Sequence, residues 1–227
     1  MPPRTAFAAV LFDLDGTLVD TAPDMVAVLA DILRAEGQPP IAYEVARSYV
    51  SNGSAGLVKL AFPDASPAEH ERLRLDFLDR YAQAVCVDSR LFPGLAELLD
   101  ELDARDLPWG VVTNKPARMT EPLLAALGVA GRAACMISGD TIRQRKPDPA
   151  PLLLAARHTG VAPEHSVYVG DAARDIMAGR AAGMHTIGAT YGYIVDGDDP
   201  RNWGAHELVA DTEELAHLLL KGVNLDA

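Results

Sequence analysis

Two pairs of carboxylates in this sequence each follow an apolar run, and together they could bind a cation. Asp13 and Asp15 lie in the segment DLDGT, directly after an apolar run, and Asp171 and Asp175 lie in GDAARD, after another apolar run. Two carboxylates held this close repel each other unless a cation or a shared proton lies between them. Mg²⁺ prefers carboxylate oxygens of this kind, together with water and substrate phosphate. The four acids therefore predict a Mg²⁺ site.

Three further residues have side chains that suit phosphate. Lys146 lies in KPDP, where two prolines restrict the backbone, and Thr113 and Asn114 follow a third apolar run. The lysine could neutralise phosphate charge, and the hydroxyl and amide could bond phosphate oxygens. Each feature alone has a plainer interpretation, because acids are common in turns and at helix starts, and a single lysine is most often solvated.

These residues need elements that bring them together, and the apolar runs supply them. Continuous apolar runs are typical of strands buried on both faces of a parallel sheet, and we expect strands over Ala8–Phe12, Trp109–Thr113, Cys135–Ser138, Val167–Gly170 and Met184–Ala189. Helical patterns between them cover Gly94–Ala104, Met119–Leu127, Pro149–His158 and Ala172–Ala182. Alternating strands and helices predict an α/β fold with a doubly wound parallel sheet, whose ligand site lies beyond the carboxyl ends of the strands.

Residues 18–84 carry helical patterns and no strand signal, and they predict a helical cap inserted into the α/β core. The core then consists of residues 1–17 and 85–227. Within the cap, the loop of Ser51, Asn52 and Gly53 is our candidate for contacts that set substrate specificity, although an ordinary helix-linking turn is an equal alternative.

Composition narrows the class of protein. The chain has 227 residues, a net charge of −12 and 49% hydrophobic residues, which indicates a globular protein whose acidic surface disfavours nucleic acid. The early apolar run Ala6–Phe12 is too short for a membrane span. The two cysteines, Cys86 and Cys135, have no paired spacing. We expect a cytoplasmic protein that acts on a small phosphorylated metabolite, with no membrane or nucleic-acid partner, as a monomer or a homodimer.

The ordered set DLDGT, Thr113-Asn114, KPDP and GDAARD, each at a predicted strand end, resembles the haloacid dehalogenase superfamily of phosphatases over essentially the whole chain. The resemblance implies a Rossmann-like core, with Asp13 as the nucleophile and Asp15 as the general acid and base. It also implies that Thr113 and Lys146 hold the transferring phosphoryl group. Mg²⁺ would bind Asp13, the Asp15 carbonyl and Asp171, with Asp175 in support.

The remaining candidate residues follow from the same match. Gly16, Thr17 and Asn114 are expected to bind substrate, next to the cap loop. Ala172 departs from the pattern, because many relatives have serine or aspartate there, and one hydrogen bond near the metal is then missing.

Within the superfamily, DGTLVDTAPD, TNKP and the YGY of residues 191–193 are most similar to the phosphoglycolate phosphatases. The runs WGVVTNKP and YGYIVDGDDPRNWGA are as similar to the N-acetylmuramic acid 6-phosphate phosphatases. The first function predicted is therefore Mg²⁺-dependent hydrolysis of 2-phosphoglycolate to glycolate and phosphate. Hydrolysis of N-acetylmuramic acid 6-phosphate is the alternative, and a sugar phosphomutase is a further one. A dehalogenase or a phosphate-binding regulator would not need Asp15.

Overall fold

A six-stranded parallel sheet forms the centre of the computed structural model, which describes residues 7–222. The strands run in the order β5-β4-β1-β6-β7-β8, and every neighbouring pair is parallel. Their bounds are β1 Ala9–Phe12, β4 Trp109–Val112, β5 Cys135–Ile137, β6 Ser166–Gly170, β7 His185–Ala189 and β8 Glu207–Val209. The predicted α/β fold with a parallel sheet is confirmed. The ends of the predicted core segments, 1–6 and 223–227, lie outside the described residues.

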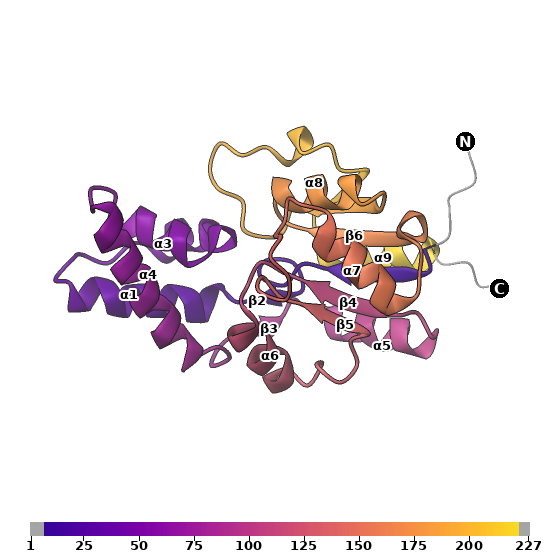
Figure 1. Cartoon of the computed structure of the whole chain (residues 1–227), viewed down its shortest axis with the longest axis horizontal. Coiled ribbons are helices and arrows are strands. Elements are labelled where there is room, and N and C mark those ends of the chain that lie inside the picture. The colour runs from indigo at the N-terminus through magenta and orange to yellow at the C-terminus, as the bar shows by residue number, and fades with distance from the viewer. Residues whose placement is uncertain (1–6, 223–227) are drawn as a thin grey trace.

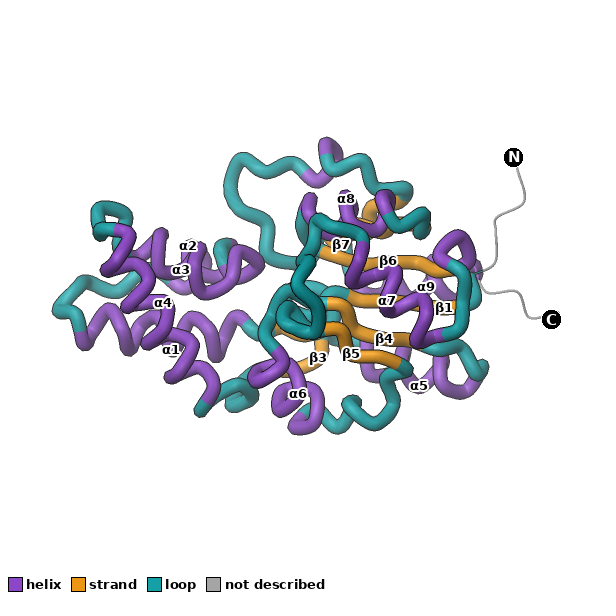
Figure 2. The backbone as a smooth tube through the Cα atoms, in the orientation of Figure 1, coloured by secondary structure: helices purple, strands orange, loops and turns teal. Residues whose placement is uncertain are grey.

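Helices cover both faces of this sheet, because alternate residues of the strands point to opposite sides. On β1, Leu11 joins the apolar cluster beneath α7 and α8, whereas Val10 and Phe12 join the larger cluster on the other face. The core helices are α5 Leu95–Ala104, α6 Ala117–Ala126, α7 Ala150–Thr159, α8 Ala173–Ala181 and α9 Thr212–Gly222. Figure 2 shows these helices packed around the strands, and the sheet is thus doubly wound as predicted.

The first four helices of the chain form a separate group that we call the cap helices. They are α1 Ala22–Ala35, α2 Tyr43–Ser48, α3 Gly53–Ala61 and α4 Pro67–Ala82, with a 3₁₀ turn over Val50–Asn52. Their buried faces include Leu29 and Ile32 of α1 and Leu73 and Phe77 of α4. Figure 1 shows the cap helices at the end of the molecule opposite the chain termini. They fall within the predicted cap range of 18–84.

A two-stranded antiparallel ribbon connects the cap helices to the core. Its strands, β2 Val19–Asp20 and β3 Arg90–Leu91, pair Val19 with Leu91 and Asp20 with Arg90. The returning chain is held by Asp24 of α1, whose buried carboxylate accepts the backbone N–H groups of residues 87, 88 and 89 at 2.9 Å each. The ribbon therefore lets the chain leave and re-enter the core at one place.

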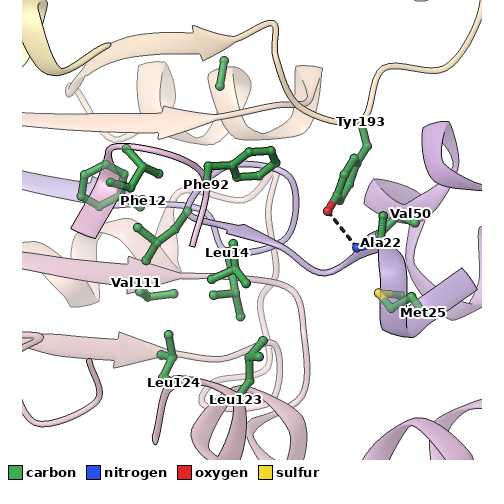
Figure 3. Close-up of a cluster of buried hydrophobic side chains, with 14 of the residues drawn as sticks. Phe12, Leu14, Ala22, Met25, Val50, Phe92, Val111, Leu123, Leu124 and Tyr193 are labelled. Atoms are coloured by element: carbon green, nitrogen blue, oxygen red, sulfur yellow. Dashed lines mark hydrogen bonds between the residues drawn. The ribbon is translucent and has the colours of Figure 1, made fainter. Parts of the chain in front are cut away.

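The ribbon and the cap are also tied to the core by Tyr193, which follows β7. Its hydroxyl accepts the backbone N–H groups of Thr21 at 2.7 Å and of Ala22 at 2.9 Å, and donates to Asp20 at 2.5 Å. Figure 3 shows the bond to Ala22 beside the buried side chains of Phe12, Leu14 and Phe92.

Three short elements were not expected from the sequence: β2, β3 and the edge strand β8. Each has two or three residues, and in β8 only Val209 is buried, so none carries an apolar run. Within residues 7–222, no helix has both the length and the apolar character needed to cross a membrane.

Candidate active site

Three buried carboxylates meet at the carboxyl end of the central strands. Asp13 directly follows β1, Asp171 directly follows β6, and Asp175 lies in the first turn of α8. Their exposed fractions are 4%, 1% and 0%, and one oxygen of each lies within 4.8 Å of those of the others. Carboxylates this close and this buried need a cation or a bound proton between them.

The two oxygens of Asp171 have different surroundings. Oδ2 accepts the Ser51 hydroxyl at 2.6 Å and the Tyr193 backbone N–H at 2.8 Å. Oδ1 is buried and has no hydrogen-bond partner among the residues that the structure describes. Burial, with the nearby Asp13 and Asp175 carboxylates, raises the pKa of Asp171 to about 8. An orphaned carboxylate oxygen beside two more carboxylates suits a hard divalent cation, so these residues fit Mg²⁺.

Lys146 lies between two of these acids. Its Nζ is 2.8 Å from Asp13 Oδ1 and 2.8 Å from Asp175 Oδ1, and it donates to the Val112 carbonyl at 2.9 Å and the Tyr168 hydroxyl at 2.7 Å. Burial by itself lowers the pKa of Lys146, but the Asp13 and Asp175 carboxylates outweigh it and raise the pKa above its ordinary value. The lysine therefore stays charged at neutral pH and offsets part of the carboxylate charge.

Asn114 and Thr113 lie beside this lysine, and all three line a cavity at the ends of the strands. The Asn114 amide donates to the Lys146 carbonyl at 3.0 Å, and its Oδ1 accepts the Lys146 backbone N–H at 3.1 Å. The Thr113 hydroxyl accepts the backbone N–H of Lys115 at 3.1 Å. The structure thus gives Asn114 a role that the sequence did not suggest, which is to hold the backbone of Lys146.

Asp15 has a separate set of partners. Its Oδ1 accepts the Lys115 ammonium at 2.7 Å and the Thr21 hydroxyl at 2.6 Å. Lys115 lies 4.4 Å from the centre of the Tyr81 ring, which comes from cap helix α4. Burial by itself lowers the pKa of Lys115, but Asp15 reverses this and raises the pKa above its ordinary value. The ammonium therefore stays charged, and Asp15 is held between the core and the start of the cap.

Gly16 and Thr17 lie in the turn that follows Asp15, and neither is among the residues that line the cavity. Gly16 has a φ of +82°, and a Cβ at this position would collide with the Asp171 carboxylate. Thr17 is fully buried, and its hydroxyl has no partner in the part of the chain that the structure describes. Their expected contact with substrate stays a prediction.

The predicted specificity loop contacts Asp171 and also lines the cavity. Ser51, Asn52 and Gly53 all line the cavity. In addition to the bond from Ser51 to Asp171, Arg174 of α8 donates to the Ser51 carbonyl at 2.7 Å.

A cavity of about 370 Å³ lies between the cap helices and the strand ends. Part of its wall is apolar and includes Met25, Phe77 and Met119. Although the net charge of the chain is −12, the cavity is lined by two acidic side chains, Asp13 and Asp15, and by five basic ones: Arg74, Lys115, Arg145, Lys146 and Arg174. The cavity therefore concentrates positive charge where a phosphate ester has room to enter.

Residues 10–189 match the family model of haloacid dehalogenase-like hydrolases. This range includes Asp13, Asp15, Asp171 and Asp175. The chain belongs to this family. Among relatives in the haloacid dehalogenase-like family, it is 44% identical over 212 residues to the N-acetylmuramic acid 6-phosphate phosphatase of Pseudomonas putida, covering 93% of this chain and 95% of the relative. It is also 44% identical over 207 residues to the phosphoglycolate phosphatase of Xanthomonas campestris, covering 91% and 94%.

A solved structure from Haemophilus somnus, described as a predicted phosphoglycolate phosphatase, superimposes with a TM-score of 0.83 at 29% identity. The match covers 93% of this chain and 97% of that one. The prediction of a haloacid dehalogenase phosphatase is thereby confirmed at the level of the family.

Several residues around this site were not predicted from the sequence as part of it. Lys115 directly follows Thr113 and Asn114, and this position at a strand end was a usable signal. Tyr193 lies in the YGY run, which was used only for the resemblance. Thr21 lies only six residues after Asp15, but nothing in this short segment indicates their hydrogen bond. The contact of Arg174 is with Ser51, 123 positions away in the chain, and a local pattern does not report it.

Proposed function

We propose that this chain is a Mg²⁺-dependent phosphomonoesterase that hydrolyses a small phosphorylated metabolite through an aspartyl phosphate. The observation that carries the proposal is the cluster of Asp13, Asp171 and Asp175 around Lys146, with Asp15 held separately nearby. Phosphoryl transfer needs positioning and charge neutralisation. A protein that only bound phosphate would not need a second acid beside the first.

In the proposed first step, an Asp13 oxygen attacks phosphorus and the bond from phosphorus to the leaving oxygen breaks. Asp15 donates its proton to that oxygen and releases the alcohol. In the second step, Asp15 takes a proton from water, whose oxygen attacks phosphorus and frees phosphate and Asp13. Thr113 and Lys146 hold the phosphoryl oxygens in both steps.

Asp13, Asp171 and the Asp15 carbonyl are the proposed Mg²⁺ ligands, with Asp175 in support. The bound ion supplies positive charge that offsets the repulsion between phosphate and the Asp13 carboxylate. Asp15 Oδ1 is occupied by Lys115 and Thr21, so we assign proton transfer to Oδ2.

Two substrates fit the proposal. The first is 2-phosphoglycolate, supported by the relative from Xanthomonas campestris that bears this name. A specific observation favours N-acetylmuramic acid 6-phosphate as the second. The cavity of about 370 Å³ and its apolar wall provide contact surface for a sugar, which a two-carbon acid would leave unused.

The test is release of free phosphate, with Mg²⁺ and with EDTA, from these two esters, β-glucose 1-phosphate and p-nitrophenyl phosphate. We expect Mg²⁺-dependent release with a preference of about 100-fold for one ester, which corresponds to about 2.7 kcal/mol. The Asp13→Asn variant serves as the control and should lose roughly 10⁴-fold or more in activity, since it lacks the nucleophile.

Other outcomes would change the proposal. Phosphate that returns to a sugar instead of appearing free would indicate a phosphomutase. Normal turnover in Asp13→Asn would remove the aspartyl-phosphate mechanism.

A further inference from the structure

One hydrogen bond runs from the cap loop to the acids of the proposed metal site. Ser51, in the 3₁₀ turn between α2 and α3, donates its hydroxyl to Asp171 Oδ2 at 2.6 Å. The two residues are 120 positions apart in the chain. The sequence suggested that Ser51 contacts substrate, but in the structure its hydroxyl is bonded to a carboxylate that fits the metal.

A second contact holds the same residue in place. Arg174 lies three residues after Asp171, in the first turn of α8. Its Nη2 donates to the Ser51 carbonyl at 2.7 Å. Both the side chain and the backbone of Ser51 are therefore bonded to the segment between β6 and α8, and the cap loop is seated on the part of the core that carries the acids.

The surroundings of Asp171 leave one oxygen for a metal. Oδ2 accepts from Ser51 and from the Tyr193 backbone, and a Cβ at Gly16 or at Gly192 would collide with this carboxylate. Oδ1 is the buried oxygen that lacks a partner within the described residues. Because a carboxylate is planar, the donors that hold Oδ2 also set the direction of Oδ1.

We propose that Ser51 is a positioning residue for the metal ligand Asp171, so that Mg²⁺ affinity depends on the cap loop being seated on the core. This inference rests on the proposed Mg²⁺ requirement. Of the two donors to Oδ2, the Tyr193 N–H belongs to the core, whereas the Ser51 hydroxyl is present only while the cap loop is seated. By linkage, bound Mg²⁺ favours the seated loop to the same degree as the seated loop favours Mg²⁺.

The test is calorimetric titration of Mg²⁺ into the full chain without substrate. Loss of a hydrogen-bond partner of a metal ligand typically weakens metal binding by about 10–100-fold. We expect Ser51→Ala to raise the Kd for Mg²⁺ by about tenfold, and Ser51→Thr, which keeps the hydroxyl, to restore most of the affinity.

Ser54→Ala is the matched control. Ser54 lines the cavity three residues further along, and its hydroxyl makes no hydrogen bond in the described part of the structure. Its Kd for Mg²⁺ should equal that of the wild type. Thermal unfolding of each variant in EDTA verifies that it is folded.

Activity gives a second readout that separates positioning from substrate contact. In Ser51→Ala, the Mg²⁺ concentration for half-maximal activity should rise, while KM at saturating Mg²⁺ stays unchanged. A raised KM with wild-type Mg²⁺ affinity would overturn the inference and restore Ser51 as a substrate contact. If the wild type itself binds no Mg²⁺, the proposed function fails first, and the inference fails with it.

Discussion

Ion pairs hold the strand-end site and also lie along the cap helices, but the two sets differ in burial. Lys146 pairs with Asp13 and Asp175, and all three side chains are at most 5% exposed. On α4, Arg72 and Glu69 also form an ion pair between a basic and an acidic side chain, but these side chains are 49% and 44% exposed.

The difference shows where charge matters in this molecule. Water and salt screen the pair on α4, and such pairs contribute little to stability. At the strand ends, the same charges lie where solvent cannot screen them, and removal of one partner leaves another charge uncompensated. The cap surface therefore tolerates changes of charge that the site does not.

Among the substitutions, the largest effect is expected from Lys146→Met, which leaves Asp13 and Asp175 buried without their cation. We expect the free energy of unfolding in EDTA to fall by about 3–5 kcal/mol. Urea denaturation measures this value, and addition of Mg²⁺ should recover part of the loss. A decrease below about 1 kcal/mol would mean that burial does not distinguish the two sets of pairs.

The second prediction concerns pH. Burial and the neighbouring carboxylates raise the pKa of Asp171 to about 8, far above the 3.8 of an unperturbed aspartate. Between these values the folded state keeps a proton that the unfolded state has lost, so stability falls as pH rises from about 4 to about 8 and then levels off.

Thermal unfolding in EDTA across this pH range measures the effect. Asp171→Asn should have a shallower dependence on pH, and Asp211→Asn, an exposed acid of the core, should behave like the wild type. If stability changed with pH equally in Asp171→Asn and in the wild type, Asp171 would not be the source of the pH dependence.

A smaller effect is expected from Tyr193→Phe, at the junction of the two regions. The variant removes the acceptor of the Thr21 backbone N–H and the shorter of two acceptors of the Ala22 N–H, which keeps Asp20 Oδ1 at 3.4 Å. Figure 3 shows the bond to Ala22. Unsatisfied buried donors cost about 1–3 kcal/mol, and chemical denaturation measures the change.

Tyr191→Phe is the matched control for Tyr193→Phe. It removes one hydrogen bond, from the Tyr191 hydroxyl to the Thr17 carbonyl at 2.9 Å, and should cost less. Equal losses in the two variants would show that the junction has no special dependence on Tyr193.

The smallest effect is expected on the cap surface. Arg72→Met removes the contacts of Arg72 with Glu69 and Glu36, which lie in a solvated position. The free energy of unfolding should stay within experimental error of the wild type at physiological salt, because screening already weakens these pairs. A loss of stability as large as that of Tyr193→Phe would show that the exposed ion pairs of the cap are not weaker than the buried contacts of the core.

The sequence predicted much of the fold where apolar patterning was strong. The runs that became β1, β4 and β6 are buried throughout, and β7 is buried except at His185, as is typical of strands covered on both faces. The strand β8 was missed because Glu207 and Leu208 are not fully buried and leave no run to detect.

At the start of α4, Ser66 accepts the Glu69 N–H at 3.2 Å, as in a capping box, but the Glu69 carboxylate pairs with Arg72, so only half of the box forms.

The sequence by itself determined that Asp13 and Asp171 lie at one edge of a sheet, since each follows a buried parallel strand and such strands end together. Only the tertiary structure decided that Ser51 bonds to Asp171 and that Lys115 bonds to Asp15. The physical reason is that periodicity reports which face of an element is buried, but not what that face packs against. A hydrogen bond between residues about 100 positions apart depends on that packing, because its strength falls steeply with small changes of distance and angle.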